Sequence, residues 1–107
     1  MLKVVFHVDE GARVHLALGN IQNLLKTNEP VTIVVVLNGP AIEAFRDDLN
    51  LRDFIAQQPQ VDFHACANAM DSHEIRSTDL PEHVKVVPAG VLDLIQLQAA
   101  GYAYIRP

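Results

Sequence analysis

Apolar residues in this sequence gather in short runs separated by more polar stretches. The runs are rich in β-branched residues and occupy positions 2–8, 31–37, 61–65, 84–89 and 102–105. Runs of this length and composition are typical of β-strands. The run at 31–37, VTIVVVL, is apolar almost throughout, which is expected of a central strand covered on both faces. The pattern therefore predicts five strands.

The segments between these runs carry apolar residues at helical spacing. Between the first two runs, such residues follow one another at steps of four, three and four: Val14, Leu18, Ile21 and Leu25. That spacing places them on one face of a helix. Comparable patterns predict helices over residues 12–27, over 41–57 in one or two pieces, over 68–76, and over 90–100 with Gly101 ending the last one.

Strands that alternate with helices predict a parallel sheet with helices on both faces, joined by right-handed crossovers. The 107 residues lie near the commonest domain size, so we expect a single domain spanning residues 1–107. The predicted fold class is therefore α/β with a five-stranded parallel sheet.

The last predicted helix is more apolar than one buried face requires. In GVLDLIQLQAA, residues 90–100, the polar side chains are Asp93, Gln96 and Gln98. Surplus apolar surface on a domain of this size usually contacts a partner chain. We expect a homo-oligomer; the alternative is that a neighbouring loop covers the helix.

Charge, hydropathy and cysteine content argue against several classes of protein, namely nucleic-acid-binding, membrane-spanning and disulfide-bonded proteins. The formal net charge of −5 argues against a nucleic-acid surface, which needs clustered Lys and Arg. No apolar run approaches the roughly 20 residues of a membrane helix, and no signal-peptide pattern precedes the first strand. A single cysteine cannot form an internal disulfide. We therefore expect a cytoplasmic protein without membrane or nucleic-acid partners.

Candidate chemistry gathers at the predicted strand ends. Open parallel sheets bind ligands beyond the carboxyl ends of their strands, and Cys66 follows the third predicted strand. A helix that starts directly after Cys66 would favour its thiolate, the nucleophilic form. His64 points to the same strand face and is a candidate base. The alternative is a buried, inert cysteine that only fills space.

Other chemistries fit the sequence less well. Asp9 and Glu10 after the first strand resemble part of a magnesium-binding phosphoacceptor site, but Cys66 stands near the place where that site needs an aspartate. We expect the acidic pair to cap or charge the first helix instead. The histidines show no metal-binding spacing such as HxxxH, so we expect neither a metal nor another cofactor.

Five stretches in order, spanning most of the chain, resemble the DsrE/DsrF-like sulfur-relay family, particularly its small stand-alone members. They are KVVFHVDE, LGNIQNLL, VTIVVVLNGPAI, VDFHACANAM and VVPAGVLDLIQLQAAGYAYIRP. The resemblance implies a three-layer α/β/α fold around a five-stranded parallel sheet, and a homo-oligomer that is often a trimer or hexamer. In relay members a cysteine after the third strand accepts a persulfide sulfur and passes it on. Cys66 falls at that position.

Two functions remain open. The first is a persulfide carrier or sulfurtransferase, in which Cys66 takes sulfur from a donor protein and presents it to an acceptor. Backbone groups that start at Ala67 and the Asn68 side chain would bind the sulfur, with Asn38 and Gly39 at the neighbouring strand end. The second is a non-catalytic oligomeric module that binds a small ligand or a protein and holds an inert cysteine.

Overall fold

The computed structural model describes all 107 residues and confirms the predicted five-stranded parallel sheet. The strand order is β4-β3-β2-β1-β5, and every neighbouring pair is parallel. The strands are β1 (Leu2–Val8), β2 (Val31–Leu37), β3 (Asp62–Cys66), β4 (Lys85–Val87) and β5 (Ala103–Ile105). The longest strands, β1 and β2, pair along their whole length at the centre of the sheet.

The helices follow the predicted order, with short 3₁₀ turns before α1 and α2 and a third between α4 and β4. They are η1 (Gly11–Arg13), α1 (Val14–Lys26), η2 (Gly39–Glu43), α2 (Ala44–Asp47), α3 (Leu49–Gln57), α4 (Ala67–Ser72), η3 (Ser77–Asp79) and α5 (Gly90–Ala99). The segment predicted as one or two pieces is divided at Asp48, whose side chain accepts a hydrogen bond from the Leu51 amide and caps α3. The helix predicted over 68–76 ends earlier, and Glu74 then has a left-handed backbone with φ of 56°.

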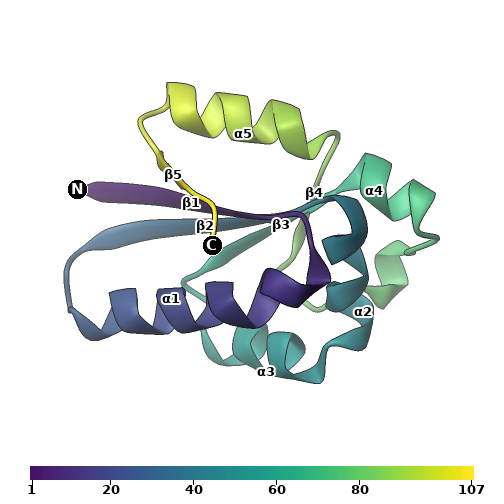
Figure 1. Cartoon of the computed structure of the whole chain (residues 1–107), viewed down its shortest axis with the longest axis horizontal. Coiled ribbons are helices and arrows are strands. Elements are labelled where there is room, and N and C mark those ends of the chain that lie inside the picture. The colour runs from purple at the N-terminus through teal and green to yellow at the C-terminus, as the bar shows by residue number, and fades with distance from the viewer.

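The elements form three layers, as Figure 1 shows. Helices α1 and α3 cover one face of the sheet, and α5 alone lies over the other. Helices α2 and α4 lie toward the end where β1, β2 and β3 finish. The three-layer α/β/α arrangement expected from the family resemblance is therefore confirmed.

The two faces of the sheet bury very different amounts of apolar surface. On the α1 and α3 side, 23 buried residues form one cluster. Within it, the Phe63 ring contacts those of Phe45 and Phe54 edge-on, with centroids 6.4 and 6.3 Å apart. On the α5 side, the buried cluster has four members: Val5, Val34, Val36 and Leu94. Most of the hydrophobic stabilisation therefore comes from the first face.

Candidate functional site

Cys66 lies at the junction between β3 and α4. It is the last residue of the strand and the N-cap of the helix, with extended backbone angles (φ −72°, ψ 117°). Its side chain is free and buried, with 6% of the residue exposed. The predicted strand-to-helix junction is thus present, but the thiol exposes little surface within a single chain.

A pocket of about 370 Å³ opens beside Cys66 at the carboxyl edge of the sheet. Four of the predicted site residues line it: Asn38, Gly39, Cys66 and Asn68. The opposite wall is the start of α5, from Ala89 to Val91. Ala67, also expected at the site, begins α4 but does not line the pocket. The turn after β2 and the starts of α4 and α5 therefore meet around the cysteine.

Gly90 brings the start of α5 close to the other walls of this pocket. A Cβ added at Gly90 would lie 3.0 Å from the Asn38 Cβ and 3.4 Å from the Cys66 Cβ. No side chain caps the N-terminus of α5, so its first amide groups are not occupied by a neighbouring side chain. Sequence patterns placed Gly90 at a strand end but gave it no role. The close packing of Gly90 against Asn38 and Cys66 arises only when three strand ends meet in the fold.

His64 is held by carboxylates on both sides. Its Nδ1 is 2.7 Å from the Asp93 Oδ2, and its Nε2 is 3.2 Å from the Asp62 Oδ2. Asp62 also accepts a hydrogen bond of 3.2 Å from Lys85. His64 and Asp93 are both buried, so the pair joins β3 to the first turn of α5 beneath the surface. His64 makes no hydrogen bond to Cys66, and its expected role as a base stays a prediction.

Asp93 is a residue that sequence reasoning left without a function. Sequence patterns marked Asp93 only as one of the polar residues in an apolar helix. A charged residue in such a helix was the one sign in the sequence that Asp93 has a buried partner. A carboxylate in a buried stretch usually has a hydrogen-bonded partner. Here the partner is His64, which comes from a strand 29 residues earlier in the sequence.

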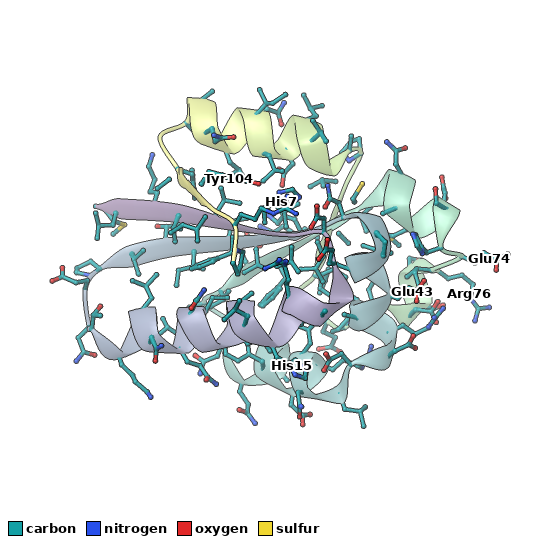
Figure 2. The ribbon with its side chains drawn as sticks, in the orientation of Figure 1. His7, His15, Glu43, Glu74, Arg76 and Tyr104 are labelled. Carbon is teal, nitrogen blue, oxygen red and sulfur yellow. The ribbon has the colours of Figure 1, made fainter.

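A second set of hydrogen-bonded polar side chains, on the α5 side of the sheet, joins β1, β5 and the turn after β2. His7 Nε2 lies 2.9 Å from the Asn38 Oδ1, and its Nδ1 lies 2.6 Å from the Tyr104 hydroxyl. Figure 2 shows His7 and Tyr104 side by side between the sheet and α5. Neither residue was predicted to belong to the site. The bond to Asn38 places this group next to the wall of the Cys66 pocket.

The remaining polar groups lie elsewhere or serve the fold. A larger depression of about 660 Å³ lies beside His15, Glu43 and Asp48 and contains no cysteine. Asp9, considered above as part of a phosphoacceptor, pairs with Arg106 at 3.2 Å.

No group of three or more His, Cys, Asp or Glu side chains is arranged to hold a metal ion. None of the helices has both the length and the apolar character needed to span a bilayer.

Solved structures similar to this chain share its fold. A protein of unknown function from Methanobacterium thermoautotrophicum, MTH1491, is 34% identical, with both chains covered over 100% and a TM-score of 0.89. The ychN protein of E. coli is 16% identical, again with 100% of both chains covered, and has a TM-score of 0.79. BT1422 of Bacteroides thetaiotaomicron, of unknown function, is 17% identical over 98% of this chain and 94% of its own, with a TM-score of 0.72.

No curated protein matches this sequence. The model of the DsrE/DsrF-like family, in contrast, matches residues 3–107, which is nearly the whole sequence. The match covers β1 from its second residue, the other four strands and the cysteine at the end of β3. The chain therefore belongs to the DsrE/DsrF-like family, which is usually associated with sulfur relay.

Proposed function

We propose that this protein is a sulfur-relay persulfide carrier in which Cys66 accepts and passes on sulfane sulfur. The observation that carries the proposal is the place of the single cysteine. Cys66 borders a pocket at the carboxyl edge of the sheet, where α/β proteins bind their ligands. Because the chain belongs to the DsrE/DsrF-like family, we favour sulfur as the group that Cys66 carries.

The chemistry is an exchange between a thiolate and a persulfide. The Cys66 thiolate attacks the outer sulfur of a donor persulfide, R–S–SH, and forms a new S–S bond. The bond between the two donor sulfurs breaks, and the donor leaves as the thiolate R–S⁻. Cys66 then carries S–SH, which ionises to S–S⁻. In the second step an acceptor thiolate attacks the outer sulfur and releases the Cys66 thiolate, so no external oxidant or reductant is consumed.

The groups around the pocket suit an anionic sulfur. Residues from the starts of α4 and α5 line the pocket beside Cys66, and helix N-termini favour negative charge. Asn68 and Asn38 add side-chain amides to the pocket lining. We assign these groups to binding the terminal sulfur of the loaded cysteine, with Gly39 forming the left-handed turn after β2 (φ 53°).

We retain His64 as a candidate base with a specific requirement. Both its ring nitrogens are within hydrogen-bond distance of carboxylates. To accept the thiol proton, one nitrogen has to release its carboxylate. The contact with Asp62 is the one we expect to break, because it is the longer of the two at 3.2 Å and Asp62 has Lys85 as an alternative partner.

We propose that the protein functions as a homo-oligomer formed through α5. Three large apolar side chains of this helix are exposed in the single chain: Val91, Leu92 and Ile95, at 63%, 47% and 58%. Val86 of the edge strand β4 is also about half exposed. Apolar side chains clustered in this way are typical of a surface that contacts another chain.

The second candidate function is a binding module with an inert cysteine. The observation that favours it is the burial of Cys66, of which 6% is exposed, since a persulfide donor has to reach the thiol. Under this hypothesis the pocket binds a small molecule or a protein segment. Chemical reactivity of Cys66 separates the two functions.

The test is intact-mass spectrometry after exposure to a limiting persulfide donor. We expect one added sulfur per chain, located at Cys66 and discharged to an acceptor thiol. The Cys66→Ser variant, which has no thiol, should keep its fold and acquire no sulfur. A wild-type chain that stays unmodified while a control thiol is loaded would favour the binding module, and equal loading of Cys66→Ser would exclude Cys66 as the carrier.

A further inference from the structure

A line of three hydrogen-bonded side chains leads from β5 to the Cys66 pocket. The Tyr104 hydroxyl is 2.6 Å from the His7 Nδ1, and the His7 Nε2 is 2.9 Å from the Asn38 Oδ1. Tyr104 and His7 come from neighbouring parallel strands, and their rings lie 5.6 Å apart. Figure 2 shows both side chains on the α5 side of the sheet. The third residue, Asn38, lines the pocket.

The chemistry of these groups fixes the direction of each hydrogen bond. The Asn38 Oδ1 can only accept, so His7 Nε2 must carry the proton and donate. A neutral imidazole then has an unprotonated Nδ1, which accepts from the Tyr104 O–H. In this arrangement the Tyr104 hydroxyl donates to His7 and His7 donates to Asn38, so the His7 N–H holds the Asn38 amide with its Oδ1 toward the imidazole.

This orientation turns the donor side of the Asn38 amide toward the cysteine pocket. With Oδ1 facing His7, the NH₂ group points the other way. The Asn38 Nδ2 lies 3.3 Å from the point that a Cβ on Gly90 would occupy, and the Cys66 Cβ lies 3.4 Å from the same point. Both groups therefore border one small space, which Gly90 leaves open. A persulfide extends the Cys66 side chain by an S–S bond of about 2 Å, and Asn38 lines the same pocket.

We propose that Asn38 donates an N–H hydrogen bond to the anionic sulfur on Cys66, and that His7 and Tyr104 are the positioning residues that hold Asn38 in the donating orientation. The inference rests on the proposed function in naming persulfide as the cargo. A thiolate sulfur is also an acceptor, so the same donor can serve it, although no hydrogen bond joins Asn38 to the Cys66 thiol in this structure. With the amide reversed, Oδ1 would face the sulfur and repel its charge.

The test compares variants of the full chain that remove one link at a time. Two rates are measured for Cys66: loading by a persulfide donor and alkylation by iodoacetamide. Asn38→Ala removes the donor, and His7→Phe keeps a ring but removes the N–H. His7→Gln restores an N–H at a similar reach, and Tyr104→Phe removes only the hydroxyl. His15→Ala is the matched control, because His15 is an exposed histidine paired with Asp48 on the α1 side.

We expect a graded set of rates. Loss of a hydrogen bond to a charged group should slow both reactions about tenfold in Asn38→Ala and somewhat less in His7→Phe. His7→Gln should recover to within about twofold of wild type, and Tyr104→Phe should lose about two- to threefold, since it loses a neutral hydrogen bond. His15→Ala should be unchanged.

A spectroscopic signal separates positioning from a general loss of structure. The side-chain NH₂ resonances of Asn38, identified by their absence in Asn38→Ala, should shift when Cys66 carries sulfur or a thiolate. That shift should persist in His7→Gln and disappear in His7→Phe while the backbone spectrum stays native.

The outcomes distinguish this inference from the proposed function. Sulfur loading that is equally fast in wild type, Asn38→Ala and His7→Phe would overturn the inference and leave the carrier intact. A chain that takes no sulfur but shows the graded alkylation rates would overturn the carrier and support the hydrogen bond. A wild-type Cys66 that resists both reagents would overturn both.

Discussion

The two faces of the sheet differ in what they bury and in what they leave exposed. The face under α1 and α3 buries 23 residues, including three contacting phenylalanines. The face under α5 buries four apolar residues, and beside them lie the His64–Asp93 pair and the His7 group. The same helix exposes Val91, Leu92 and Ile95. The difference indicates that one face stabilises the chain, while the other carries polar chemistry and a contact surface.

The largest expected effect comes from a cavity on the well-packed face. Phe63→Ala should lower the free energy of unfolding by about 3–5 kcal/mol, because Phe63 is 1% exposed and packs against two other aromatic rings. Leu94→Ala on the α5 side should cost less, about 2 kcal/mol, because Leu94 is a smaller side chain in a buried cluster of four residues. Urea unfolding of both variants measures the difference.

If Leu94→Ala were as damaging as Phe63→Ala, the two faces would contribute equally to stability. The contrast in stability between the two faces would then be wrong. The ratio of the two losses therefore tests the contrast directly.

The next effect concerns assembly rather than folding. Ile95→Glu should convert the proposed homo-oligomer to monomers with unchanged secondary structure, because Ile95 is 58% exposed in the single chain and a buried, unpaired charge at an interface is strongly unfavourable. Leu16→Glu is the matched control: an exposed residue of α1 on the opposite face, at 52%. Light scattering with size-exclusion chromatography gives the mass of each variant. If the oligomer persisted in Ile95→Glu but dissociated in Leu16→Glu, the interface would lie on the α1 side and not at α5.

A smaller effect is expected from the buried hydrogen bond between His64 and Asp93. Asp93→Asn keeps an oxygen acceptor for His64 but removes the charge, so we expect a loss of about 1–2 kcal/mol in the free energy of unfolding. The start of α5 should also loosen, since this bond joins it to β3. Asp53→Asn, on the exposed surface of α3, is the control. Denaturation and amide exchange over residues 90–94 measure the two effects, and unaltered exchange would mean that other contacts hold α5.

The smallest effect is expected at the exposed ion pair between Arg46 and Asp47 of α2. The hydrogen bond from Arg46 holds the pKa of Asp47 below its ordinary value of 3.8. A lowered folded-state pKa gives a contribution to stability that is present above the unfolded pKa and is lost as the pH falls through the folded one. Arg46→Ala should return the Asp47 pKa toward 3.8 and change the stability at neutral pH hardly at all, since both side chains are exposed. An NMR titration of Asp47 checks the direction; an unchanged pKa would mean that the hydrogen bond does not persist in solution.

Local patterns in the sequence were sufficient to predict the strands and most of the helices. Apolar runs and helical spacing depend on neighbouring residues, so β1 and β2 begin and end where expected. The same reasoning placed Cys66, Asn38, Gly39 and Asn68 at strand ends, and the pocket brings them together. The helix over 68–76 was predicted too long because its apolar pattern gave no sign of the left-handed turn at Glu74.

The contacts that complete the site depend on strand order, which local patterns do not contain. Tyr104 meets His7 only because β5 pairs with β1 instead of lying at the far edge beside β4. Gly90 is close to Asn38 and Cys66 only because α5 crosses back over the sheet. Asp93 finds His64 for the same reason. Long-range geometry of this kind could not be derived from spacing along the chain.

The pairing of β5 with β1 has a consequence for synthesis of the protein. His7 and Tyr104 are separated by 97 positions, so their hydrogen bond cannot form until the last strand has been translated. The large cluster under α1 and α3 consists entirely of residues up to Ile75 and can begin to pack earlier. Contacts between distant segments form late and slow folding. Packing of the cluster that contains Cys66 can therefore begin before the hydrogen bond between Tyr104 and His7 is able to form.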